Sequence, residues 1–337
     1  MALNNPKIKA HRLLWLLLAA SLAPVPLRAQ PLYTGSAGLM AEEVDHMYVK
    51  AMQFLVRTQS PQGNWPDEPR GNEAALNGLA VISLLAHGDD PNFGPYSATL
   101  HRALDFILKG MDPKTGYIGT SMYNHGFATL ALAESYGAVD DPRLGPALQK
   151  AVRLIVNAQK LNGLHAWRYS PESQDADTTV SGAQMVALLA ARNAGMAVPE
   201  EAIQNGLKFF LSCQTPEGGF GYISPNAPNA TRTAIACVVL ALAREKNSAA
   251  FKSAFAFLKN TQPDRAYPQY FLYYASQAWF HGSPELWQGW NRANIAALRA
   301  AQTPDGNWEG QLGSTFATAG SLLSLALNYR YLPIYER

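Results

Sequence analysis

The sequence predicts an all-α protein, an α/α toroid or (α/α)6 barrel made of six helical hairpins. A short pattern of helix, glutamine, glycine and aromatic residue recurs along the chain. Amphipathic helices alternate with Ala-rich helices that are apolar on nearly every side. Long Gly/Pro-rich loops alternate with short returns. We therefore expect an outer layer of amphipathic helices around an inner, buried layer of Ala-rich helices.

The pattern is clearest in the stretch KAMQFLVRTQSPQGNW, residues 50–65. Apolar residues spaced three to four apart predict an amphipathic helix over 47–58, and the turn residues that follow end it. Gln59 lies at the helix end, where its amide can bond backbone groups that lack a helical partner, and Trp65 can lie against its stem. A second, Ala-rich helix is predicted over 72–86.

Glutamines in the same setting recur at intervals of 100, 55, 48 and 40 residues. The first interval holds two units, because Phe106, Gly116 and Tyr117 carry the pattern midway without a glutamine. The residues predicted to form this structural repeat are Gln59, Trp65, Gln159, Gln214, Phe220, Gln262, Gln302 and Trp308. The hairpins are expected at about 44–88, 96–137, 143–195, 199–245, 249–281 and 284–331, within one domain over 30–337.

The N-terminus has the layout of a secretory signal peptide over residues 1–29. Basic residues precede an apolar run from Leu13 to Leu27, and cleavage is expected near Ala29. The alternative is a membrane anchor, but the run is short for a span and is broken by Pro24 and Pro26. The sequence therefore predicts an exported chain, periplasmic or secreted, with no transmembrane segment after cleavage.

Charge and cysteine content point to few partners. The net charge of +2 comes without a basic run, so nucleic acid is not an expected partner. Cys213 and Cys237 are too few for a disulfide framework; buried free thiols are expected, with a single bridge as the alternative. No spacing of His and Cys suggests zinc, so neither a metal nor another cofactor is expected.

The pattern of basic residue, Phe, Leu, Gln, Gly and Trp resembles the QW repeat of squalene and oxidosqualene cyclases, and more broadly the prenyltransferase/squalene-oxidase repeat superfamily. That resemblance implies a toroid like those of terpenoid cyclases and protein prenyltransferases. The stretches 123–129, 177–182, 273–277 and 329–333 resemble an uncharacterised branch of exported bacterial single-toroid proteins. The Asp-x-Cys zinc ligands of prenyltransferase β subunits are not matched, since Cys237 follows Ile235 and Ala236.

Asp175-Ala176-Asp177-Thr178-Thr179 resembles the D-x-D-D-T acid motif of class II terpenoid cyclases. The resemblance implies that Asp177 is the acid that protonates an alkene, with Asp175 beside it. The sequence departs from the motif at its fourth position, where Thr178 replaces an aspartate. The alternative is that Asp177 caps an inner helix, a position that favours aspartate.

The long loops place the expected cavity at the N-terminal end of the inner helices, where six partial positive charges converge. His125 there is a candidate acid or base, or a hydrogen-bonding partner of a loop. Four polar residues at that level suit a polar head group, or else pair between helices: Glu73, Asn124, Arg232 and Thr315. The fifth inner helix carries residues that either line the cavity or fill it: Tyr270, Tyr273, Tyr274 and Gln277.

Three functions follow from these patterns. The first is an exported toroid that binds a hydrophobic or amphipathic molecule, an isoprenoid, a lipid or a peptide, in its central cavity. The second is a terpene cyclase-like enzyme, acid-initiated, with Asp177 as the proton donor. The third is a protein-docking scaffold without catalysis, whose centre is filled. A cavity of a few hundred cubic ångströms would favour a ligand over the scaffold.

Overall fold

The computed structural model describes residues 39–66 and 73–335. The chain divides into two compact units, Met1–Glu42 and Glu43–Arg337, and the second carries the fold. The predicted signal peptide, residues 1–29, lies outside the described residues. Within the part that is described, no helix is both long enough and apolar enough to cross a bilayer.

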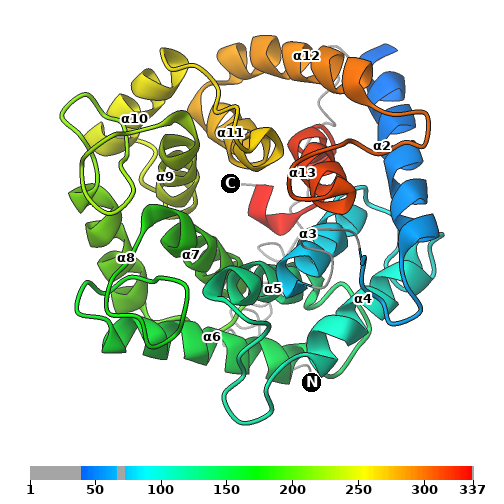
Figure 1. Ribbon diagram of the computed structural model, residues 1–337, viewed down its shortest axis with the longest axis horizontal. Coiled ribbons are helices and arrows are strands. Elements are labelled where there is room, and N and C mark those ends of the chain that lie inside the picture. The colour runs from blue at the N-terminus through cyan, green and yellow to red at the C-terminus, as the bar shows by residue number, and fades with distance from the viewer. Residues whose placement is uncertain (1–38, 67–72, 336–337) are drawn as a thin grey trace, which may run out of the picture. The chain divides into compact units, whose positions relative to one another are not determined.

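Twelve α-helices in the described ranges form six hairpins, which confirms the predicted α/α toroid. The first helix of each hairpin lies in the outer ring, and the second lies in the inner ring (Figure 1). The outer helices are α2 (Leu39–Thr58), α4 (Ser97–Lys109), α6 (Leu144–Leu161), α8 (Glu200–Ser212), α10 (Ala249–Lys259) and α12 (Pro284–Ala301). The inner helices are α3 (Ala74–Leu85), α5 (Met122–Ser135), α7 (Thr178–Asn193), α9 (Ala230–Leu242), α11 (Pro268–Gly282) and α13 (Ser314–Ala326).

The inner ring is closed. Each inner helix packs against the next one around the ring, and α13 packs back against α3. Small residues allow this close packing: a Cβ atom on Gly78 of α3 would lie 2.6 Å from the carbonyl oxygen of Phe127 in α5. The outer helices bury only one face, as their amphipathic pattern predicts.

The repeat glutamines connect neighbouring outer helices. In four of the five, the side-chain Nε2 donates to a backbone carbonyl in the first half of the next outer helix, at 2.8–2.9 Å, whereas Gln262 is exposed. The pairs are Gln59 with Thr99, Gln159 with Ala202, Gln214 with Ala250, and Gln302 with Met47. The last pair joins α12 to α2 and so closes the outer ring.

The glycine and the aromatic residue of the repeat stabilise the loop that follows the outer helix. Gly63 has φ +94°, and a Cβ atom there would lie 2.2 Å from the carbonyl oxygen of Arg102, so only glycine fits. The indole Nε1 of Trp65 donates to the carbonyl of Leu55, which lies in the last turn of α2. Trp167 and Trp308 make the equivalent bond in their own repeats.

The C-terminal segment returns to the middle of the ring. After α13, the chain forms a short 3-10 helix, η1 (Pro333–Tyr335), which lies inside the ring of inner helices in Figure 1. Leu332, Ile334 and Tyr335 are buried. The centre of the toroid is therefore partly filled by the chain's own tail.

Both cysteines are free and buried, in line with the expectation of unpaired thiols. Burial raises the pKa of Cys213 and of Cys237 above the ordinary thiol value. These thiols therefore stay protonated near neutral pH, as inert apolar groups.

Replacing Gln302 by Leu is expected to destabilise the ring where α12 meets α2. The substitution removes two hydrogen bonds, to the carbonyls of Met47 and Gly306, at a cost of about 1–3 kcal/mol. Thermal unfolding of the variant measures the loss. The exposed Gln262 is the matched control, because it holds the same place in the fifth repeat. Equal losses for Gln262→Leu and Gln302→Leu would contradict the bridging role.

Candidate functional site

Asp177 forms the N-cap of α7, at the end of the toroid where the long loops gather. Its Oδ1 accepts hydrogen bonds from the backbone amides of Thr179 and Val180, both at 2.8 Å, and from the Thr179 hydroxyl at 2.6 Å. The side chain is fully buried. One carboxylate oxygen is thus committed to the helix cap, as the capping alternative anticipated.

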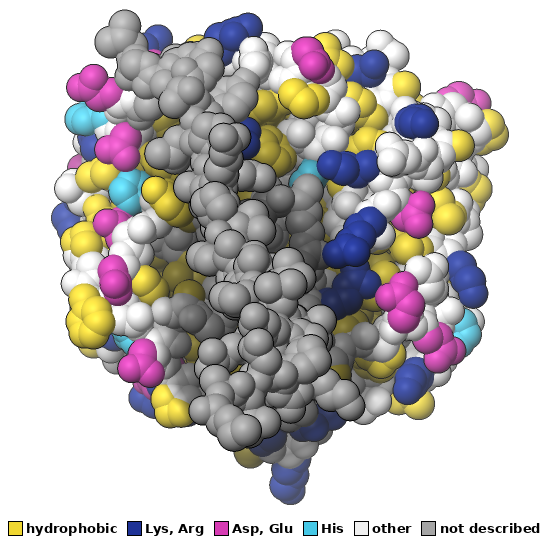
Figure 2. All heavy atoms as spheres, turned by 180° about the vertical axis from the view of Figure 1, so that it is seen from behind, with side chains coloured by type: hydrophobic (Ala, Val, Ile, Leu, Met, Phe, Trp, Pro, Cys, Tyr) yellow, Lys and Arg dark blue, Asp and Glu magenta, His cyan; other side chains and the backbone are white. Residues whose placement is uncertain are grey.

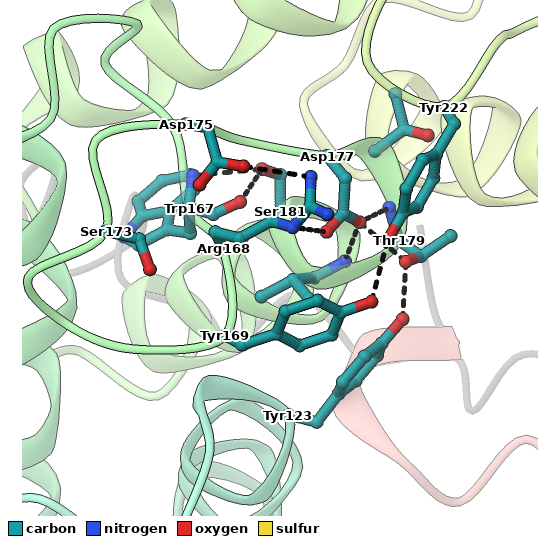
Figure 3. Close-up of polar contacts among 12 residues, drawn as sticks. Tyr123, Trp167, Arg168, Tyr169, Ser173, Asp175, Asp177, Thr179, Ser181 and Tyr222 are labelled. Carbon is teal, nitrogen blue, oxygen red and sulfur yellow. Dashed lines mark hydrogen bonds and ion pairs between the residues drawn. The ribbon is translucent and has the colours of Figure 1, made fainter.

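Arg168 faces the other oxygen of this carboxylate (Figure 3). Its Nε is 3.4 Å from Asp177 Oδ2, and its Nη1 is 3.3 Å from Asp175 Oδ2. The guanidinium carbon lies 5.0 Å from the ring centre of Tyr169 and 5.1 Å from that of Tyr222. Asp177 Oδ2 is buried and has no hydrogen-bond partner.

Arg232, on α9, also lies near the ring of Tyr222. Its guanidinium carbon is 5.8 Å from the ring centre of Tyr222, and its Nη2 donates to the carbonyl of Ala227 at 2.8 Å. Burial lowers the pKa of Arg232 from its ordinary value, and its Nε has no hydrogen-bond partner. The hydroxyls of Tyr169 and Tyr222 lie 2.7 Å apart. We call these four residues, Arg168, Tyr169, Tyr222 and Arg232, the arginine–tyrosine shelf.

The sequence identified Arg232 but missed the other three shelf residues. Their roles depend on two different loops meeting in space, which the repeat pattern does not specify. A weak pattern exists nonetheless: Tyr169 and Tyr222 each follow the repeat aromatic residue, Trp167 or Phe220, by two positions.

Three tyrosines extend from Thr179 towards α11, of which Tyr274 is fully buried and Tyr123 and Tyr270 are partly buried. The hydroxyl of Tyr123 donates to Thr179 Oγ1, the group that also bonds Asp177. Tyr270 and Tyr274 meet edge to face, with ring centres 5.2 Å apart. Burial raises the pKa of Tyr123, of Tyr270 and of Tyr274, so all three stay neutral.

Two further residues of the fifth inner helix pack deeper in the ring. Tyr273 packs edge to face against Phe127 of α5, with ring centres 6.0 Å apart. Gln277 is buried and donates to the carbonyl of Tyr273 in its own helix at 2.8 Å. The structure therefore links Asp177 to Tyr123 through Thr179, with Tyr270 and Tyr274 near Tyr123, while Tyr273 and Gln277 pack among the inner helices.

His125 lies away from the shelf, between α5 and α6. Its Nδ1 accepts from the amide of Ile118 at 3.2 Å, so Nε2 carries the proton and donates to the carbonyl of Ala151 at 3.1 Å. Burial lowers its pKa to about 4. Both nitrogens are therefore used by the fold, and the imidazole is neutral near pH 7.

The remaining predicted site residues lie at the starts of other inner helices. Asn124 Oδ1 accepts from the amide of Ala75 at 2.9 Å and so ties α5 to α3. Glu73 holds the N-cap position of α3 without a side-chain capping bond, and Thr315 is buried in the first turn of α13. The structure does not gather these residues onto the arginine–tyrosine shelf.

A cavity of about 490 Å³ lies at the opposite end of the inner helices from the one that the sequence favours. The ends of α3, α5 and α7 and the C-terminal tail form its wall. We call it the C-terminal cavity, and its lining is Leu85, Gly88, Asp89, Pro91, Ala133, Glu134, Tyr136, Gly137, Ala138, Ala190, Asn193, Ala194, Tyr331, Leu332 and Pro333.

One residue of this cavity could have been noticed in the sequence. Glu134 is the one acidic residue of the inner segment GFATLALAES.

The profile of one protein family, described as a domain of unknown function (DUF6288), matches residues 46–304. The fold resembles that of the type II terpene cyclase MstE from Scytonema. The apo enzyme matches with a TM-score of 0.62 and 16% identity over 86% of this chain and 99% of that one. A variant in complex with its substrate, geranylgeranyl dihydroxybenzoate, matches with a TM-score of 0.60 and 17% identity, over 86% and 98%.

The fold also resembles that of the α-1,6-mannanase GH76A of Salegentibacter sp. HEL1_6. An inactive variant in complex with α-1,6-mannotetrose matches with a TM-score of 0.66 and 9% identity, over 84% of this chain and 98% of that one. At these identities, the likeness to both enzymes shows the toroid fold alone.

The neutral His125 predicts a specific loss of stability in acid. The unfolded chain takes up a proton on this residue near pH 6.5, whereas the folded chain does so only near pH 4. Its contribution is therefore fully present above pH 6.5 and is lost as the pH falls towards 4, by about 3 kcal/mol in unfolding free energy. Denaturant unfolding between pH 7.5 and pH 4 measures this loss.

The loss should shrink in His125→Gln and persist in a variant of the exposed His46, His46→Gln. If His125→Gln keeps the full pH dependence of the parent protein, then the folded protein does not hold this imidazole in its neutral form.

Proposed function

The chain belongs to the family described as a domain of unknown function (DUF6288), and we propose that it binds an amphipathic molecule with an acidic head group. The site is the arginine–tyrosine shelf, at the N-terminal end of the inner helices. The observation that carries this proposal is a pair of incompletely bonded guanidinium groups, those of Arg168 and Arg232, which both lie within 6 Å of the ring centre of Tyr222.

The two arginines suit a carboxylate. Both ion pairs of Arg168 exceed 3.2 Å, while good pairs of this kind measure about 2.7–2.9 Å. Asp175, one of its partners, is exposed and easily replaced by a ligand. Arg232 retains a buried Nε–H without a partner. An incoming carboxylate would therefore gain hydrogen bonds that the protein alone does not complete.

The N-terminal ends of two inner helices also favour a negatively charged ligand. The shelf lies beside the N-termini of α7 and α9, which carry partial positive charge. Asp177 offsets part of it, but its Oδ1 is already held by three donors of the helix cap. Arg168 and Arg232 face the carboxylates of Asp175, Asp177 and Asp264, so an incoming anion would take the place of the exposed Asp175.

Exposed apolar side chains on the loops that precede the inner helices suit the other half of the ligand. Tyr169 is 47% exposed, and Ile223, next to Tyr222, is 57% exposed. Leu164 and Tyr267, on the loops before α7 and α11, are also exposed. Exposed apolar groups beside a charged centre are typical of sites for amphipathic molecules.

We propose an isoprenoid or lipid acid as the ligand. A terpene cyclase of the same fold holds geranylgeranyl dihydroxybenzoate, which joins a prenyl chain to an acidic head. We also propose that the protein is exported after cleavage near Ala29. N-terminal sequencing of the protein purified from its host tests this cleavage.

Binding is favoured over acid-initiated cyclisation by the contacts of Asp177. A proton donor must carry its proton on an oxygen that faces the substrate. Here Oδ1 accepts three hydrogen bonds, and Oδ2 faces the guanidinium of Arg168, which is itself a donor. Neither oxygen is presented as an acid to an alkene.

Titration calorimetry with farnesoic acid and farnesol tests the proposal, because the two share a chain and differ in the head group. The acid should bind at least about tenfold more tightly, and Arg168→Gln should remove that preference. Arg153→Gln, an exposed change on α6, is the matched control and should bind as the parent does. Equal binding of acid and alcohol would refute an anion site.

Incubation with geranylgeranyl dihydroxybenzoate tests the enzymatic alternative. We expect the compound to be recovered unchanged from the parent protein and from Asp177→Asn, as mass spectrometry would show. A cyclised product that the parent protein forms and the variant does not would establish Asp177 as the acid and overturn the binding proposal.

A further inference from the structure

We propose that the C-terminal cavity is a second binding site, for an organic cation. Its volume of about 490 Å³ falls within the range of about 300–1,000 Å³ that small-molecule sites occupy. It lies at the opposite end of the inner helices from the arginine–tyrosine shelf and shares no residue with it.

The charge of the wall is negative. Asp89 and Glu134 line the cavity, and no lining residue is basic. Glu134 is only 5% exposed and comes from the last turn of α5. Asp89 accepts from His87 at 2.6 Å, and Glu134 adds a second carboxyl group to the wall. A ligand with positive charge would complement this wall, while an anion would be repelled.

The backbone adds to this field. Helices α3, α5 and α7 all end at the cavity, where Leu85, Glu134 and Asn193 form part of the wall. The C-terminal end of an α-helix carries partial negative charge, because its last carbonyl groups lack helical partners. Three such ends beside a buried carboxylate favour a cation independently of the side-chain charges.

The rest of the wall suits an organic cation better than a bare metal ion. Leu85, Ala133, Ala190 and Leu332 give it apolar surface. Tyr136 and Tyr331 lie at the cavity and are partly exposed, and tyrosine rings attract ammonium groups. These features match a substituted amine with both a charge and an apolar body.

The C-terminal tail holds one of these rings in place. Tyr331 packs against Gly88, where a Cβ atom would lie 2.3 Å from the ring. Tyr329 stacks on Tyr331 from two positions earlier, with ring centres 6.5 Å apart. The buried Leu332 and Ile334 anchor the segment on the other side. The tail therefore contributes a fixed wall to the site.

Choline and its neutral isostere 3,3-dimethyl-1-butanol test the proposal, by titration calorimetry on the full chain. Choline should bind at least about tenfold more tightly than the alcohol, because only choline carries the charge. Glu134→Gln should weaken choline binding by about tenfold or more, while Glu217→Gln, at an exposed position elsewhere, should not. Absence of choline binding, or equal binding of the two compounds, overturns the proposal.

A second variant guards against misfolding of Glu134→Gln. Tyr331 is exposed, so Tyr331→Ala should keep the fold and lower choline affinity by about fivefold. Arg168→Gln, at the shelf, should leave choline binding unchanged and so separates this site from the acid-binding one. Unchanged choline affinity in Tyr331→Ala, or a loss in Arg168→Gln, would contradict a site at the C-terminal cavity.

Discussion

The bond from a repeat glutamine to the next outer helix, made in four of the six hairpins, is the interaction on which the toroid depends. A helical hairpin cannot bury its inner helix alone, so each unit needs a neighbour at a fixed angle. The amides of Gln59, Gln159 and Gln214 set that angle by reaching a carbonyl of the following outer helix. Gln302 makes the same bond to Met47 and turns a row of hairpins into a ring.

Closure of the ring gives its two ends opposite electrical character. All six inner helices begin at one end, so partial positive charges gather there and partial negative charges gather at the other. The side chains proposed to bind the two ligands follow the same division, with Arg168 and Arg232 at the N-terminal end and Asp89 and Glu134 at the other. The two proposed ligands, an acid and an amine, follow from this single asymmetry.

The fold could be predicted from the sequence because the repeat is local. Gln59, Gly63 and Trp65 act within one corner of the structure, so their spacing carries the information. Asp177 could likewise be interpreted as a cap, since capping involves only the next three residues. Tyr270 and Tyr274 were expected at the centre, and their spacing on an inner helix was enough to place them there.

The arginine–tyrosine shelf could not be found in this way, because Arg168 and Tyr222 come from different hairpins. The return of the tail to the centre and the cavity beside it also depend on contacts between distant segments.

Amide hydrogen exchange tests the closed ring most directly. A closed toroid has no terminal repeat, so the amides of α2 and α13 should be protected as strongly as those of α7, in the middle of the sequence. An open row of hairpins would fray from its ends. Exchange in α2 and α13 that is much faster than in α7 would contradict the closed ring, and with it the opposite charges of its two ends.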